Sequence, residues 1–88
     1  MNKDGKKLEF KDMINKSGLE FVDISSEIYR AYLKDNTVIQ KIDEPIALNV
    51  NNSGGHRVLD ARGNAYYIKP EWDILRWKTK EGLPHFVA

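Results

Sequence analysis

Alternating apolar and polar positions after Gly18 predict a series of short β-strands. The alternation is cleanest over residues 46–50, where three aliphatic side chains point one way and Ala47 and Asn49 the other. Pro45 is expected to end the strand before it, because proline cannot donate a ladder hydrogen bond. Clusters of turn-forming residues separate the other runs. The predicted strands are 19–33 with a bend at Ser25-Ser26, then 37–42, 46–50, 56–60, 65–69, 72–80 and 83–87.

The first 18 residues differ from the rest, because they are the most polar stretch of the chain. Leu8, Phe10, Met13 and Ile14 partly fit helical spacing, which predicts a short helix over 9–16 ended by a stop at 17–18. We therefore divide the chain into a polar N-terminal segment, 1–18, and a β domain, 19–88. The fold class is mainly β: a small antiparallel meander or barrel of about six to seven strands with a short N-terminal helix.

Composition narrows the classes of function. Fourteen Lys+Arg against thirteen Asp+Glu leave a net charge of +1 over 88 residues, which excludes a highly basic nucleic-acid coat and an acidic DNA mimic. The absence of cysteine excludes disulfides, thiol catalysis and cysteine-ligated zinc, and favours a reducing compartment. No apolar run approaches the roughly 18 residues of a membrane span, so no membrane association is expected. A domain this short buries only about 60–65% of its unfolded surface, which makes a homo-oligomer an expectation.

No arrangement of residues typical of an enzyme is visible. The two histidines are His56 and His85, and no nucleophile elbow, phosphate-binding loop or zinc-protease helix is present. His56 and Asp60 share a strand face but lie about 13 Å apart, too far for a hydrogen-bonded pair. A metal site from both histidines requires folding to bring the two together. We therefore expect no catalysis, no cofactor and no metal.

The loop before the fifth predicted strand suggests an anion site. In Ser53-Gly54-Gly55-His56-Arg57, consecutive glycines let backbone N–H groups converge on an anion, and the Arg57 guanidinium adds a planar donor. The alternative is a hairpin loop whose glycines serve turn geometry alone. In the binding interpretation, side chains outside the loop complete the site: Arg62 for charge, Tyr67 or Trp72 for stacking, and Asn49, Asn51 or His56 for ribose and base edges.

Aromatic and basic residues gather in the last third of the chain. Alternation places Tyr66, Ile68, Leu75 and Trp77 inward and leaves a second set outside, namely Tyr67, Lys69, Arg76 and Lys78. One aromatic ring with three cations is suited to single-stranded nucleic acid, and equally to a solvated sheet face. Trp72 follows a strand-breaking Pro-Glu pair, so it is either a rim anchor for a partner or a cover over the open end of the fold.

The sequence over about residues 27–88 resembles small β-rich proteins of phages and prophages. The likeness is carried by the run 46–60, Gly63, Tyr66-Tyr67-Ile68, Pro70, Trp72, Leu75, Trp77 and the ending 82–88. Such proteins are often host-takeover or anti-defence factors of the bacterial cytoplasm. One class forms oligomeric sponges that sequester cyclic nucleotide or ADP-ribose-derived immune signals without cleaving them. The resemblance implies function at this class level and assigns no residue.

Three functions therefore stay open. The first is a non-enzymatic sponge for a nucleotide-derived signal, held by Ser53, Gly54, Gly55, His56, Arg57, Arg62, Tyr67 and Trp72. The second is an inhibitor of a host or defence protein, which uses an exposed sheet edge or the Trp72 rim. The third is a single-stranded nucleic-acid-binding module on the Tyr67, Lys69, Arg76 and Lys78 face.

Overall fold

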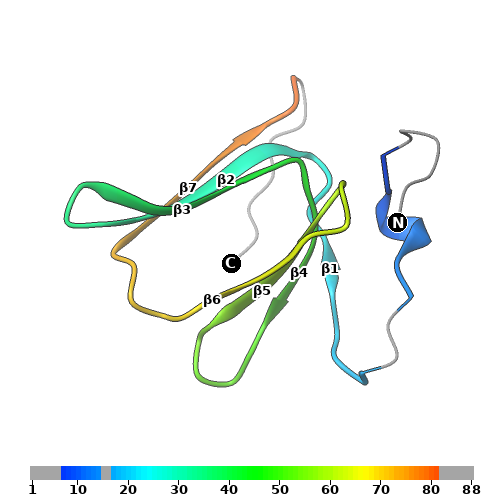
Figure 1. Cartoon of the computed structure of the whole chain (residues 1–88), viewed down its shortest axis with the longest axis horizontal. Helices are drawn as coiled ribbons and strands as arrows, with labels where there is room; N and C mark the ends of the chain where they lie inside the picture. Colours follow the sequence, from blue (N-terminus) through cyan, green and yellow to red (C-terminus); the bar gives the residue numbers. More distant parts are fainter. Residues whose placement is uncertain (1–6, 15–16, 82–88) are drawn as a thin grey trace.

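Seven strands form two antiparallel sheets in a computed structural model, which describes residues 7–14 and 17–81 (Figure 1). Sheet A has the strand order β1-β4-β5-β6 and sheet B the order β3-β2-β7. The elements are η1 (Phe10–Asp12, a 3-10 turn), β1 (Val22–Asp23), β2 (Glu27–Lys34), β3 (Thr37–Asp43), β4 (Pro45–Val50), β5 (His56–Asp60), β6 (Ala65–Ile68) and β7 (Ile74–Thr79).

The chain crosses from sheet B to sheet A at a one-residue corner between β3 and β4 (Figure 1). Glu44 forms this corner with a φ of 52°, a conformation that L-residues rarely adopt. Its N–H donates to the Ile28 carbonyl at 2.8 Å, and its carbonyl accepts from the Ala61 N–H at 2.9 Å. The corner is therefore bonded both to sheet B and to the turn that ends β5 in sheet A.

The predicted fold class is confirmed: the protein is mainly β, and residues 7–14 and 17–81 contain seven strands, one short 3-10 turn and no closed barrel. Two of the predicted boundaries are corrected. The run 19–33 is two strands in different sheets, because a turn at Ser25 and Ser26 divides it. Pro45 begins β4, since the break falls at Glu44. The predicted strand 83–87 lies outside the described residues.

The predicted helix over 9–16 is reduced to the 3-10 turn Phe10–Asp12, with residues 15–16 outside the described part. The apolar side chains that suggested a helix serve a different purpose. Leu8, Phe10 and Met13 pack against a small cluster on sheet A around Ala47. The Leu8 N–H also donates to the Ala61 carbonyl at 2.8 Å, which an extended segment allows. Packing on the sheet therefore outweighs local helical spacing.

The main core receives side chains from both sheets. Tyr32 and Ile42 come from sheet B, while Leu48 and Val58 come from sheet A, and all four are at most 1% exposed. The alternation predicted for β6 and β7 is confirmed, because Tyr66, Ile68, Leu75 and Trp77 are at least half-buried while Tyr67, Lys69, Arg76 and Lys78 are exposed.

A chain of hydrogen bonds passes through this core. Arg30 binds both carboxylate oxygens of Glu27, at 2.9 and 2.6 Å, and both side chains are fully buried. The Arg30 Nη1 donates to the Tyr32 hydroxyl at 3.3 Å, and that hydroxyl lies 2.8 Å from the His56 Nδ1. Because β2 belongs to sheet B and β5 to sheet A, we call these four residues the inter-sheet chain.

Glu27 and Arg30 meet only because β2 is irregular. Residues three apart on a regular strand point to opposite faces. The pairing of β2 with β7 shifts register between Glu27 and Tyr29, which reverses that parity. Burial lowers the pKa of Arg30, but its bonds to Glu27 and Tyr32 outweigh this and raise the pKa above the ordinary value. Arg30 therefore stays charged inside the core.

Neutralising Glu27 tests the inter-sheet chain. Glu27→Gln keeps the shape of the side chain but leaves the Arg30 charge buried and uncompensated, so we expect a loss of about 3–5 kcal/mol in unfolding free energy. Urea unfolding measures it. The matched control is Glu44→Gln, whose partners Lys7 and Arg62 are exposed, with an expected loss of about 1 kcal/mol or less. Equal losses in the two variants would contradict a structural role for the buried pair.

Candidate functional site

The loop between β4 and β5 is closed by the side chain of Asn51. Its Oδ1 accepts from the N–H groups of Ser53 at 3.1 Å and Gly55 at 2.8 Å, and from the Ser53 hydroxyl at 2.9 Å. The Gly54 N–H donates to the Asn51 carbonyl at 3.0 Å. These donors already have internal acceptors, which corrects the expected anion nest. The alternative interpretation, a hairpin loop whose residues serve turn geometry, therefore applies to Ser53, Gly54 and Gly55.

Gly55 is required for a different reason, which is the close approach of Tyr67. A Cβ on Gly55 would lie only 2.8 Å from the Tyr67 Cζ, well inside van der Waals contact. The Tyr67 hydroxyl accepts a hydrogen bond from the Asn51 Nδ2 at 2.9 Å. The loop therefore fixes the position of the Tyr67 ring rather than binding an anion itself.

Arg57 and Tyr67 form the centre of the candidate site. The two residues are directly paired across β5 and β6, and the Arg57 guanidinium carbon lies 5.4 Å from the centroid of the Tyr67 ring. On the other side, the Arg57 Nη1 donates to the Asn49 Oδ1 at 2.9 Å, and the Asn49 Nδ2 donates to the Glu20 carbonyl at 2.8 Å. This contact network holds the guanidinium over the outer side of sheet A.

Arg57 keeps donors available for a ligand. Among the described residues it forms no ion pair with a carboxylate, and one of its five N–H groups is engaged by Asn49. An open cavity of about 260 Å³ lies beside it, with Phe21, Leu59, Ala65 and Tyr67 in its lining. We call this surface the Arg57 face, defined by Phe21, Asn49, Arg57, Leu59, Ala65 and Tyr67. It offers a charged planar donor next to an apolar floor.

His56 belongs to the core rather than to the site. It is 4% exposed, and burial together with the Arg30 charge lowers its pKa from 6.5 to about 4. A neutral ring fits its hydrogen bond, because the Tyr32 hydroxyl, which accepts from Arg30, lies 2.8 Å from the His56 Nδ1, and in one of the two neutral tautomers this nitrogen accepts the Tyr32 proton. The expected contact of His56 with ribose or a base is therefore corrected.

Trp72 covers the core, as the second of its two interpretations predicts. Its ring meets Tyr32 edge-on with 4.8 Å between centroids and lies 4.7 Å from the His56 ring. The side chain is half-buried and packs against the main core. It is therefore not a free rim anchor for a ligand or a partner.

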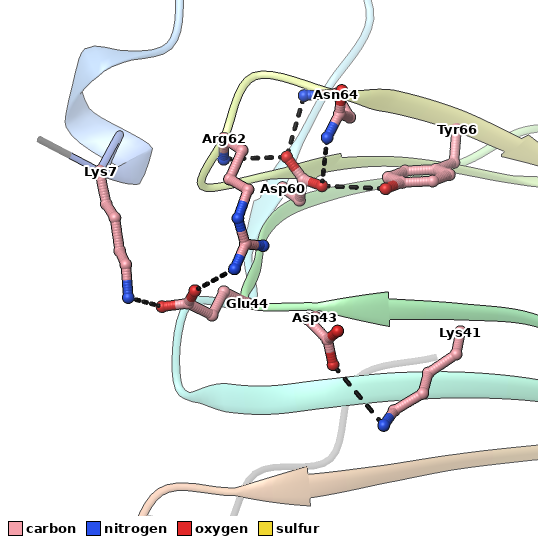
Figure 2. A network of polar contacts seen from close by, with 8 residues as sticks. All are labelled: Lys7, Lys41, Asp43, Glu44, Asp60, Arg62, Asn64 and Tyr66. Atoms are coloured by element: carbon pink, nitrogen blue, oxygen red, sulfur yellow. Dashed lines mark hydrogen bonds and ion pairs between the residues drawn. The ribbon is translucent and has the colours of Figure 1, made fainter. Parts of the chain in front are cut away.

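Arg62 lies at the opposite end of β5 from the glycine loop, in a polar network at the corner (Figure 2). Its Nη2 is 3.3 Å from the Glu44 Oε1, while the Lys7 Nζ is 2.7 Å from the Glu44 Oε2. The hydrogen bond from Lys7 lowers the pKa of Glu44, although burial opposes it. The structure therefore does not bring Arg62 together with Arg57 and Tyr67.

Asp60 organises the β5–β6 turn and is not a partner of His56. Its carboxylate accepts from the N–H groups of Arg62 and Asn64, the Asn64 side chain and the Tyr66 hydroxyl, at 2.9–3.1 Å (Figure 2). Burial raises the pKa of Asp60, but these bonds outweigh it and the pKa is lowered.

A larger cavity, of about 560 Å³, lies between the N-terminal segment and the corner. Lysines and carboxylates both line it, and Lys7–Glu44 and Lys11–Glu9 are already ion-paired at 2.7 and 3.4 Å. It therefore shows no preference for one sign of charge. Over residues 7–14 and 17–81, no group of three or more His, Asp or Glu is placed to hold a metal, and no helix is long and apolar enough to span a membrane.

The predicted face of Tyr67, Lys69, Arg76 and Lys78 is divided between the two sheets. β6 pairs with β5 in sheet A, whereas β7 pairs with β2 in sheet B. A meander, in which neighbouring strands pair, would have placed β6 beside β7, but each of the two pairs with another strand.

Comparisons with protein-family models, with curated proteins and with solved structures find no significant match. The function is therefore inferred from the geometry of these surfaces.

The neutral state of His56 predicts a pH dependence of stability. As pH falls below 6.5, His56 in the unfolded chain becomes protonated, whereas His56 in the folded chain stays neutral until about pH 4. The unfolding free energy should therefore fall by about 2–3 kcal/mol across that window. Urea unfolding at several pH values measures it. In His56→Asn the side-chain amide can hydrogen-bond to the Tyr32 hydroxyl but does not titrate, so a profile as steep as that of the parent chain would contradict the assignment.

Gly55→Ala should disturb Tyr67 specifically. The added methyl group displaces the ring and its bond to Asn51, which loosens the Arg57 face while leaving the core intact. We expect a loss of about 1–3 kcal/mol in stability from overpacking, together with a shifted tyrosine ring signal in NMR spectra. Gly54→Ala is the comparison, because its Cβ meets only Pro70, at 3.6 Å. Its φ of 93° strains the backbone, but Tyr67 should stay in place.

Proposed function

We propose that this chain is a non-enzymatic binding module that holds a nucleotide-derived small molecule on the Arg57 face. The observation that carries the proposal is the state of Arg57: its guanidinium is stacked on Tyr67, fixed by Asn49 and without a carboxylate partner among the described residues. A half-buried arginine in this state favours an anionic partner, because its charge is positioned but not neutralised.

The chemistry of the face suits a nucleotide. The remaining guanidinium N–H groups match phosphate oxygens in a two-pronged geometry. The plane of the same group stacks on aromatic bases, as the Tyr67 ring does. Phe21, Leu59 and Ala65 supply the apolar floor on which a base lies. The proposal keeps Arg57, Tyr67 and Asn49 of the predicted site and adds Phe21.

The size of the cavity supports an oligomeric site. At about 260 Å³ it lies below the range of about 300–1,000 Å³ typical of enclosed ligand sites. One ring system fits on the face, and the rest of a dinucleotide extends beyond it. A second copy of the chain against the same face would enclose that remainder. The ligand class in this proposal is a cyclic nucleotide or an ADP-ribose derivative, sequestered without cleavage by an anti-defence protein in the bacterial cytoplasm.

The protein-inhibitor alternative has less support. Its Trp72 anchor is packed against Tyr32 and His56 and does not present a free ring. The other contact surface of this alternative is an edge of one of the two sheets. A stoichiometric protein partner captured from bacterial lysate, with no absorbance at 260 nm in the purified protein, would favour it.

Calorimetry with a panel of cyclic di- and trinucleotides and cyclic ADP-ribose isomers tests the proposal. We expect one ligand class to bind the parent chain and Arg57→Gln to weaken that binding at least about tenfold, because it removes charge-assisted hydrogen bonds. Arg57→Lys should not restore it, since an ammonium neither stacks nor binds with two prongs. Lys69→Gln, an exposed cation beside β6, is the matched control. No heat and no thermal shift at high ligand excess would reject the proposal.

A further inference from the structure

The outer side of sheet B carries aromatic and basic side chains that three different strands bring together. The pairing register places Lys41 and Arg76 on either side of Ala31, and Asp43 and Lys78 on either side of Tyr29. The intervening positions Arg30, Tyr32 and Ile42 point into the core, so these rows share the opposite side. We call them the Tyr29 face, defined by Tyr29, Ala31, Lys41, Asp43, Arg76 and Lys78.

Positive charge predominates on this face. Three cations stand against the single carboxylate of Asp43, which lies 3.7 Å from the Lys41 Nζ. Arg76 and Lys78 form no ion pair with any described residue. The Lys41 Nζ also lies 5.0 Å from the centroid of the half-buried Tyr29 ring. The face thus has a net charge of +2, whereas the whole 88-residue chain carries +1.

We propose that the Tyr29 face binds single-stranded nucleic acid. Lys41 and Arg76 are two strand spacings apart, about 10 Å between backbones, so both long side chains can reach one phosphate placed between them, over the buried Ala31. Arg76 and Lys78 follow each other at about 7 Å along β7, which lets successive phosphates of an extended strand meet successive cations. The Tyr29 ring among these cations offers a stacking surface for a base.

The arrangement of the face favours a nucleic acid over a lipid surface. A peripheral membrane contact places its apolar groups where they insert and its cations around them. Here the ring of Tyr29 lies in the middle of the cations, with Lys41 against it. The exposed aliphatic side chains Val38 and Ile74 lie toward one end of the sheet, in the row of Leu33. Binding to anionic vesicles is therefore a competing outcome of the test.

The experiment is a fluorescence-anisotropy titration of the full chain against a labelled oligothymidylate at several salt concentrations. Three phosphate contacts predict a slope of log K against log salt of about −2, since each contact contributes about −0.7 on single strands. Arg76→Gln with Lys78→Gln should reduce the slope by about 1.4. Tyr29→Leu should weaken binding about tenfold or more with little change of slope, because a stacked ring rather than a charge is lost.

The control removes the same charges from the other side of the molecule. Arg62→Gln with Lys69→Gln deletes one arginine and one lysine, both exposed, that lie at the ends of sheet A strands. It should leave most of the slope in place. Equal reduction by this control, or tighter binding to phosphatidylserine vesicles that the oligonucleotide does not displace, would overturn the proposal. So would flat anisotropy.

Two further readouts keep this face distinct from the Arg57 face. The Arg57→Gln variant should bind the oligonucleotide like the parent chain. Loss of oligonucleotide binding in this variant would mean that the nucleic-acid site lies on sheet A instead. If Tyr29→Leu fails to give the thermal melt of a folded chain, the Arg76 and Lys78 variant decides the outcome, since both side chains are exposed.

Discussion

The inter-sheet chain from Glu27 to His56 is the constraint on which the two outer surfaces depend. It buries a charged pair, which is costly unless every donor and acceptor is matched. No buried side-chain nitrogen or oxygen lacks a hydrogen-bond partner over the described residues, so the requirement is met. Because Tyr32 holds His56 inward at the start of β5, Arg57 must point outward, and its cross-strand partner Tyr67 with it. A shift of one residue would place the arginine in the core.

Local patterns predicted the fold class but not the pairing of distant strands. Alternation correctly assigned the inward and outward positions of β6 and β7, since that property depends only on neighbouring residues. The pairing of β7 with β2 joins positions about 45 residues apart and leaves no local signal. The irregularity near Glu27 was also invisible, because it reverses parity without any glycine or proline to mark it. The buried ion pair could not be predicted for this reason.

The candidate site was predicted in part, and for reasons that needed correction. Arg57 and Tyr67 were chosen as separate ligand contacts, whereas they are one stacked pair. The glycines were assigned to an anion, yet Asn51 occupies their donors. The signal that was missed is the strand register that the two hairpin turns impose. A loop closed at Asn51 to Gly55 pairs 49 with 57, and a turn closed at Asp60 to Asn64 pairs 57 with 67, which places Asn49, Arg57 and Tyr67 in one row.

Net charge was a poor guide to partners because it averages over positions that act separately. Salt screens exposed charges beyond about 8 Å, so a ligand senses only the charges around its own site. Several carboxylates are committed elsewhere: Glu27 to the core, Asp60 to the β5–β6 turn and Glu44 to the corner. Their use at these places leaves Arg57 without a carboxylate partner among the described residues, and leaves three cations against one acid on the Tyr29 face. A chain of nearly balanced composition thus acquires two locally cationic surfaces through the same carboxylates that hold its fold together.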